Sequence, residues 1–197
     1  MANMNELLEK LALEKSVSLD DMPEIDLYMD QVIQLFDHKY KETKRNDDEK
    51  ILTKTMINNY AKGKLFIPIK NKKYSKKHLI LISLIYQLKG ALSITDIKST
   101  LQIINDKITT DDIDLEAFYT SLLTLQKINS ENISESIHIK QLEVKQMIGE
   151  EDEKLEQIML IASLVNMSTS YRKIAERLID EISETIVESD SETKTKK

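Results

Sequence analysis

Residues 53–101, TKTMINNYAKGKLFIPIKNKKYSKKHLILISLIYQLKGALSITDIKSTL, decide the fold, because a hairpin signal lies there between helix signals. Thr53 is a good N-cap residue, and Gly63 suits the position just after a helix end. The two residues therefore predict a short helix over 54–62.

Four polar residues share one face of this predicted helix, at i, i+3, i+4 and i+7: Thr55, Asn58, Asn59 and Lys62. The opposite face is apolar and consists of Ile57, Tyr60 and Ala61. Asparagine is a weak helix former, so two in a row lower the helix stability by a few tenths of a kcal/mol each. We infer that this polar face was selected for what it contacts.

A hairpin signal follows the helix. Residues 65–69 read as a strand, and 70–72 turn the chain back through Lys73 and Tyr74. Pro68 has no backbone N–H, which confines this strand to the edge of a sheet. The pattern predicts a small β-hairpin with lysines at its tip.

Two more helices complete this part of the chain. Ser75 begins a helix over 76–89, which Gly90 ends, and Ser93 begins another over 94–105. Before the stretch, the pattern predicts an amphipathic helix within 1–22 and a second helix over 28–40. The chain has only three glycines and two prolines among 197 residues, which favours a mainly α-helical fold.

From residue 110 onward the sequence is acidic and predicts helices over 112–128, 134–148 and 151–187, the last two joined at Gly149-Glu150-Glu151. The tail after Glu188 holds no apolar residue, and we expect it to be disordered. The domain organisation predicted from these patterns is an N-terminal helical arm (1–24), a DNA-binding domain (25–107), an acidic helical domain for dimerisation or regulation (108–188) and a disordered tail (189–197).

Charge is distributed unevenly along the chain. Between Lys50 and Thr95 there are ten lysines and no aspartate or glutamate, although the whole protein has a formal net charge of −6. Such a single-sign segment repels itself in a compact state, and an anionic partner rationalises it. Together with the helix and the hairpin, it predicts contact with double-stranded DNA.

Several classes of function are excluded or disfavoured. Cysteine is absent, which excludes disulfides and thiolate chemistry. No phosphate-binding loop, nucleophile elbow or metalloprotease motif occurs. The three histidines (His38, His78 and His138) lie in different predicted elements, and we expect them at the surface. We therefore expect no enzyme activity, no metal and no cofactor.

The sequence also predicts the compartment. The first ten residues lack the order of a secretory signal. The longest apolar run, Leu79–Tyr86, is far shorter than the ~20 residues that span a bilayer. We expect a cytoplasmic protein that does not contact a membrane.

Residues 53–101 resemble the MerR-like winged helix-turn-helix. The resemblance is carried by Thr55-Met56, Gly63-Lys64-Leu65, Lys73-Tyr74, Leu79–Leu88 and Leu92–Ile97, and it covers about 30–105. It implies a winged helix-turn-helix that binds DNA. The segments LTKTMINNY, KKYSKKHL and SYRKIAERLIDEI are also similar to an uncharacterised family of low-GC Gram-positive bacteria, domain of unknown function 1836, over most of 25–185.

The expected DNA-binding residues are Lys54, Thr55, Asn58, Asn59, Lys62, Lys70, Lys72, Lys73 and Tyr74. In the major groove, the two asparagine amides can each pair with adenine N6 and N7. The lysines and Thr55 are expected on phosphates, with Lys70, Lys72 and Lys73 along the neighbouring groove. Tyr74 either donates to a phosphate or packs under the hairpin.

We therefore expect a sequence-specific transcriptional regulator that binds double-stranded DNA as a homodimer through its C-terminal helices. Their apolar stripe either meets a second copy or packs back on its own domain. The alternative function is a protein-interaction module, an antirepressor-like adaptor whose basic face binds an acidic protein. The absence of arginine from the predicted recognition helix favours this alternative.

Overall fold

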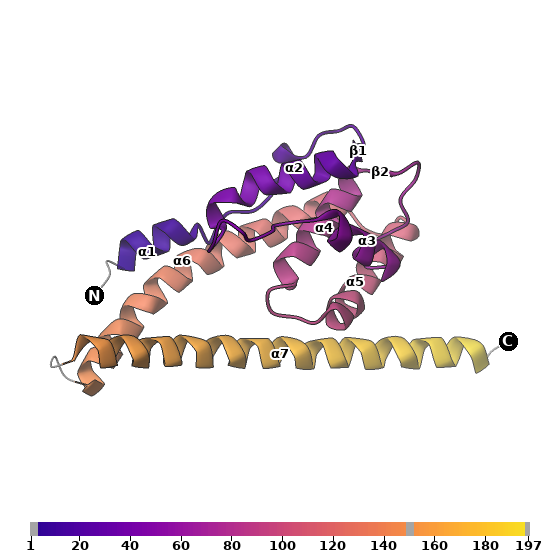
Figure 1. Ribbon diagram of the computed structural model, residues 1–197. Coiled ribbons are helices and arrows are strands. Elements are labelled where there is room, and N and C mark those ends of the chain that lie inside the picture. Colours follow the sequence, from indigo (N-terminus) through magenta and orange to yellow (C-terminus); the bar gives the residue numbers. More distant parts are fainter. Residues whose placement is uncertain (1–3, 149–151, 196–197) are drawn as a thin grey trace.

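The computed structural model describes residues 4–148 and 152–195, and side chains up to residue 184 (Figure 1). Within this part the protein is mainly α-helical, as predicted. The helices are α1 (Met4–Leu11), α2 (Met29–Tyr40), α3 (Lys54–Lys62), α4 (Lys76–Leu88), α5 (Ile94–Thr109), α6 (Leu115–Ile148) and α7 (Glu153–Thr195). Strands β1 (Leu27–Tyr28) and β2 (Lys73–Tyr74) form one antiparallel pair, and single 3₁₀ turns lie at Leu19–Asp21 and Lys41–Thr43.

Helix α4 is the centre of a compact unit. Its residues from His78 to Ile85 are all buried, as expected for a helix that is apolar on every side. The hydrophobic core around it runs from Val17 to Tyr119, and the Tyr119 hydroxyl donates to the Val17 carbonyl at 2.6 Å. The compact unit (residues 17–119) therefore extends beyond both ends of the predicted 25–107.

The predicted helix over 54–62 is confirmed, with one difference at its end. The Thr53 hydroxyl accepts from the Met56 N–H at 3.2 Å, which is an N-cap. At the other end, Lys64 and not Gly63 adopts the left-handed conformation, with φ 57°. Leu65 N–H donates to the Tyr60 carbonyl and Lys64 N–H to that of Ala61, a Schellman motif. Gly63 lies close to Leu65, and a Cβ there would lie 2.6 Å from Leu65 Cδ1, so this leucine side chain would have to shift.

The predicted strand over 65–69 is wrong. Residues 65–69 form an irregular connection, and β2 pairs with β1, with Leu27 opposite Tyr74 and Tyr28 opposite Lys73. Leu65 and Phe66 are buried in the core, and Pro68 cannot donate to a ladder, so the segment packs rather than pairs. The turn itself is present: Lys73 N–H donates to the Lys70 carbonyl at 2.9 Å.

The ends of the chain also differ from the predictions. Helix α1 covers only Met4–Leu11 of the predicted 1–22, because Ala12 is left-handed (φ 45°) and residues 17–22 enter the core. Helix α6 is continuous, whereas two helices were predicted; residues 129–133, of which the first four are polar, include no glycine or proline to break it. Helix α7 continues to Thr195, past the predicted end at 187 and into the segment for which no structure was expected. The predicted joint at 149–151, like residues 196–197, lies outside the described residues.

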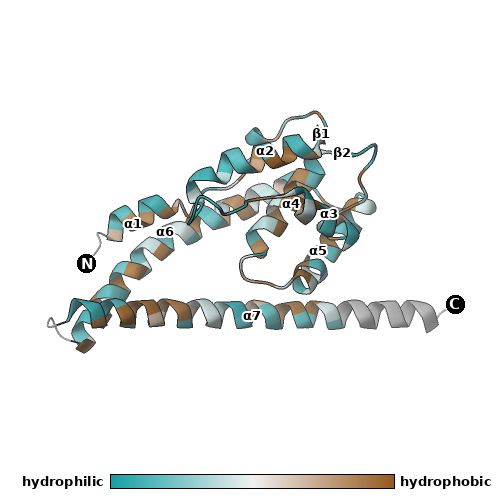
Figure 2. Cartoon of the chain, viewed as in Figure 1, coloured by the Kyte–Doolittle hydropathy of each residue, from teal (hydrophilic) through white to brown (hydrophobic). Residues whose placement is uncertain are grey.

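Helices α6 and α7 contact each other, and α7 also passes along α5. Many large apolar side chains on this helix pair remain exposed, among them Leu142, Leu155, Ile158, Ile161 and Val165. Figure 2 shows strongly hydrophobic residues near the N-terminal end of α7 and more hydrophilic ones toward its middle. In the part of the chain that the structure describes, no helix is long and apolar enough to cross a membrane.

His78 was expected at the surface, but it is buried, with 5% of its area exposed. The Ser75 N–H donates to its Nδ1 at 3.1 Å, and the ring lies 5.9 Å from those of Phe66 and Tyr74, measured between centroids. Burial lowers the pKa of the imidazole, although the nearby carbonyls of Ile67 and Pro68 act in the opposite direction. Protonation would also remove the acceptor for the Ser75 N–H.

The lowered pKa of His78 predicts a loss of stability in mild acid. Above its ordinary pKa of 6.5, His78 is neutral in both states and nothing changes. Below 6.5 the unfolded chain binds the proton first, so the free energy of unfolding falls by up to ~1.4 kcal/mol per pH unit until the folded pKa is reached. Urea unfolding between pH 5 and 8 measures this slope. His78→Gln keeps an acceptor at the third helix position and should flatten the slope; an unchanged slope contradicts the assignment.

Candidate nucleic-acid interface

The polar face of α3 is exposed, as the residue pattern predicts. Ile57 and Tyr60 are buried beneath the helix and fix its rotation. The side chains of Thr55, Asn58, Asn59 and Lys62 consequently face solvent, as does that of Lys54 in the first turn. Two adjacent amides, each with donors and an acceptor, therefore lie on a surface that the described residues leave uncovered.

The basic turn, residues 70–73, presents lysines from a tight two-residue turn. Asn71 and Lys72 are both left-handed, with φ values of 52° and 59°, the pattern of a type I′ hairpin turn. Lys70, Asn71 and Lys72 are exposed. Figure 1 shows α3 and the connection to β2 at the same end of the compact unit, away from α1.

Tyr74 does not belong to the surface. Only 1% of its area is exposed, and its ring packs edge-on against Phe66 and His78. Its hydroxyl is buried and finds no hydrogen-bond partner among the described residues, and burial raises its pKa. The expected phosphate contact of Tyr74 is therefore wrong, and the packing alternative is correct.

Two surface residues of this region were missed by the sequence reasoning. Tyr28 on β1 is exposed, and the Lys73 ammonium lies over its ring, 5.4 Å from the centroid. Lys64 is exposed at the end of α3. No neighbouring residue in the sequence indicates that Tyr28 belongs to this surface, because it lies beside Lys73 only through the pairing of two strands that are far apart in the chain. The position of Lys64 directly after Gly63, at the predicted end of the helix, could have indicated that its side chain is exposed.

The lysines of the acid-free segment differ in their partners. Lys54 pairs with Asp30 at 2.8 Å, but both side chains are exposed, so the pair contributes at most about 1 kcal/mol. Lys76 lies between Glu24 and Glu116, at 2.8 and 3.1 Å. By contrast, no carboxylate of the described residues lies within ion-pair distance of four exposed lysines: Lys62, Lys64, Lys70 and Lys72.

Lys89 points away from this group. Its ammonium donates to the Ile51 carbonyl at 2.9 Å and lies 4.3 Å from the centre of the Tyr86 ring. Burial lowers the pKa of this ammonium. Lys50 and Lys77 are also exposed and form no ion pair with the described residues, so four of the six exposed, unpaired lysines of the segment lie on the end of α3 and on the basic turn.

Replacing Lys72 by glycine should stabilise the protein. A left-handed lysine costs ~1–2 kcal/mol, which glycine avoids at an entropic cost of ~0.5–1 kcal/mol, so the free energy of unfolding should rise by about 0.5–1 kcal/mol. Urea unfolding measures the change. Lys72→Ala is the control, because it removes the charge and keeps the strained backbone; an equal rise for alanine contradicts the argument.

Within the described residues, no group of three or more histidine, aspartate or glutamate side chains could hold a metal ion. Comparison with curated proteins and with solved structures found no match. A family model does match residues 17–122, which is nearly the extent of the compact unit and more than half of the chain. The chain therefore belongs to the family described as domain of unknown function DUF1836.

Proposed function

We propose that this protein is a transcriptional regulator that binds double-stranded DNA sequence-specifically as a dimer, with a MerR-like winged helix-turn-helix. One observation carries the proposal. The exposed Asn58–Asn59 face of α3 lies in a segment without acidic residues. Unpaired lysines of this segment lie at the end of α3 and at the tip of the basic turn. Base-reading amides flanked by phosphate-binding cations are the arrangement that duplex recognition requires.

In the proposed complex, α3 enters the major groove. Asn58 and Asn59 each pair with an adenine edge through donor and acceptor atoms. Lys54, Thr55 and Lys62 bind phosphates on either side of that groove, and Lys70, Lys72 and Lys73 follow the backbone beside it. Lys64 joins them at the end of the helix.

Backbone strain supports a role for two of these cations. Lys64 and Lys72 are both left-handed, in positions that glycine occupies at a lower free-energy cost. Glycine at both sites would make a more stable helix end and hairpin turn. A selected interaction of the ammonium groups explains why lysine is kept there.

The exposed apolar side chains of α7 support the dimer. Leu160 faces inward and is 7% exposed, whereas Ile158 and Val165 are 62% and 61% exposed. The spacing of Leu155, Ile158, Ile161 and Val165 places them on one face, opposite the face of Leu160. A helix that is apolar on two opposite faces requires two partners, and the second is a copy of the chain. Two recognition helices would then read half-sites about 34 Å apart.

A salt titration tests DNA binding. Six phosphate contacts by the proposed lysines should give a log–log slope of affinity against salt of about −5 to −6 per protomer. Fluorescence anisotropy with mixed-sequence duplexes between 50 and 300 mM salt measures it. No binding to any duplex at the lowest salt would refute the proposal.

The second candidate function is the antirepressor-like adaptor, favoured by the absence of arginine from α3. An acidic protein surface would then take the place of DNA on the same face. Capture from a cell lysate with and without nuclease separates the two functions: a protein partner that is kept after nuclease supports the adaptor, and loss of all captured material supports the regulator.

A further inference from the structure

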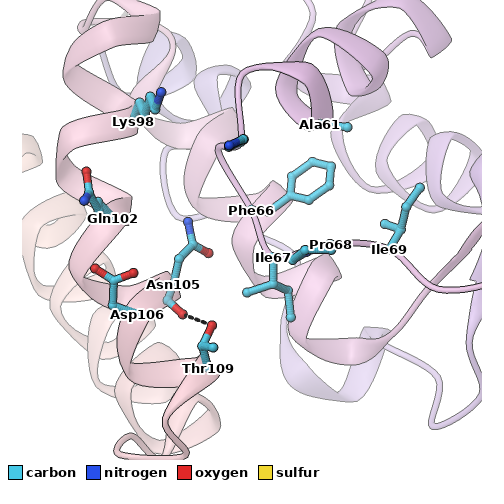
Figure 3. A pocket seen from close by; sticks show the side chains of 11 residues that line it. Ala61, Phe66, Ile67, Pro68, Ile69, Lys98, Gln102, Asn105, Asp106 and Thr109 are labelled. Atoms are coloured by element: carbon cyan, nitrogen blue, oxygen red, sulfur yellow. Dashed lines mark hydrogen bonds between the residues drawn. The ribbon is translucent and has the colours of Figure 1, made fainter.

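A groove lies beside the connection that replaces the predicted strand. It has a volume of about 740 Å³ and runs between α5 and residues 64–69 (Figure 3). Figure 3 shows Lys98, Gln102 and Asn105 on the α5 side, opposite Phe66 and Ile69. The floor is apolar, and the groove falls within the size range of sites that bind small ligands or short peptide segments.

The groove contains an acceptor without a donor. The Asn105 side chain donates its Nδ2–H to the Leu65 carbonyl at 3.0 Å, which fixes the amide orientation. Its Oδ1 is buried and accepts no hydrogen bond from the described residues. A buried oxygen left in this state costs ~1–3 kcal/mol, so an occupant that displaces the side chains covering it and brings an N–H to it gains from the contact.

The connection itself supplies donors. Among the described residues, no acceptor is found for the backbone N–H groups of Ile67 and Ile69. Pro68, between them, has none. Ile67, Ile69 and Asn105 all line the groove, so two unpaired donors of the chain and one unpaired acceptor of a side chain belong to residues that border it.

The charged residues at the rim of the groove favour one kind of ligand over another. Lys64 and Lys98 are exposed at one end, and Asp106 is the one carboxylate among the residues that line the groove. A phosphate would suit the lysines but has no N–H for Asn105 Oδ1. A peptide backbone has both N–H and C=O groups, and an acidic side chain on it would reach the lysines.

We propose that this groove binds an extended peptide segment of a partner protein, with an apolar side chain on the floor and an acidic one at Lys64 and Lys98. The peptide backbone donates to Asn105 Oδ1 and accepts from Ile67 and Ile69, as in the addition of a strand to a sheet edge. α3 contributes only Ala61 to this groove, but Lys64 belongs both to the groove and to the proposed DNA contact, so peptide and DNA would share that lysine.

The test is a selection of displayed random linear octapeptides on the full chain. A synthetic peptide of the enriched sequence is then titrated by fluorescence anisotropy against the wild-type chain and two variants. Lys98→Glu reverses a charge on the groove, and Lys107→Glu makes the same change on the same helix outside it. We expect apolar and acidic residues in the enriched peptides, about tenfold weaker binding by Lys98→Glu, and less than about twofold change by Lys107→Glu.

Hydrogen exchange gives a second measurement. Addition of the selected peptide should slow exchange of the Ile67 and Ile69 amides at least about tenfold, because they become hydrogen-bonded. Equal losses in the two lysine variants, enrichment of basic peptides, no enrichment at all, or unchanged exchange at both amides would each overturn the proposal. DNA binding by the same variants is measured separately, so failure here leaves the regulator proposal standing.

Discussion

Replacing Ile158 and Val165 by glutamate is expected to turn the proposed dimer into a monomer and to weaken the proposed DNA binding by about 100-fold or more. Both side chains are more than 60% exposed on the outer face of α7. Burying each against a second copy contributes ~1.5–3 kcal/mol, and a buried unpaired carboxylate costs several more. In a dimer, binding of one recognition helix holds the second close to its half-site, which raises the affinity for DNA by ~10²–10⁴. A monomer loses this increase.

Gln157→Glu with Asn166→Glu is the matched control. These residues are exposed on the same helix and gain the same charges, but they are polar to begin with. Analytical ultracentrifugation measures the oligomeric state, and anisotropy with a two-site duplex measures the affinity. A wild-type monomer, or a variant that still dimerises, would contradict the proposed role of this face.

Replacing Asn58 and Asn59 by alanine should remove most of the sequence preference while leaving non-specific affinity nearly unchanged. Each amide that pairs with an adenine contributes ~1–3 kcal/mol of discrimination, so the ratio of specific to non-specific affinity should fall at least about tenfold. Replacing Lys70 and Lys72 by alanine should do the opposite. It should weaken all duplexes alike and reduce the salt slope by about 2.

The same substitutions on α6 serve as controls: Asn129 and Asn132 to alanine, and Lys127 and Lys145 to alanine, all exposed side chains. A duplex selected from random oligonucleotides and a scrambled version of it provide the two affinities. If the asparagine variant loses affinity for both duplexes equally, or the lysine variant loses only the selected one, the roles assigned to the two groups are wrong.

The sequence predicted the helices of the compact unit well because their ends carry strong local signals. Thr53, Ser75 and Ser93 are N-cap residues, and each begins a helix in the structure. The pairing of β2 with β1 could not be predicted in this way, because Leu27 and Tyr74 are far apart in the chain. The predicted interruption at 129–133 is absent, because these residues include no glycine or proline and polar residues do not break a helix.

The candidate site was partly predictable for the same reason. The face of Asn58, Asn59 and Lys62 follows from the helical period and two apolar anchors. Tyr74 was misplaced because an exposed hairpin was expected, whereas the core draws in both Phe66 and Tyr74. The groove beside α5 could not be seen at all, since its walls come from segments that meet only in three dimensions.

The hydrogen bond between Tyr119 and the Val17 carbonyl bears on synthesis of the chain. The two residues are 102 positions apart, so the compact unit has long-range contacts at its two ends. On the ribosome, Val17 emerges early and must await Tyr119 before its environment is complete. Until then the run from Leu79 to Ile85, which is wholly apolar apart from Ser83, remains incompletely covered, and we expect the nascent chain to be prone to aggregation over this interval.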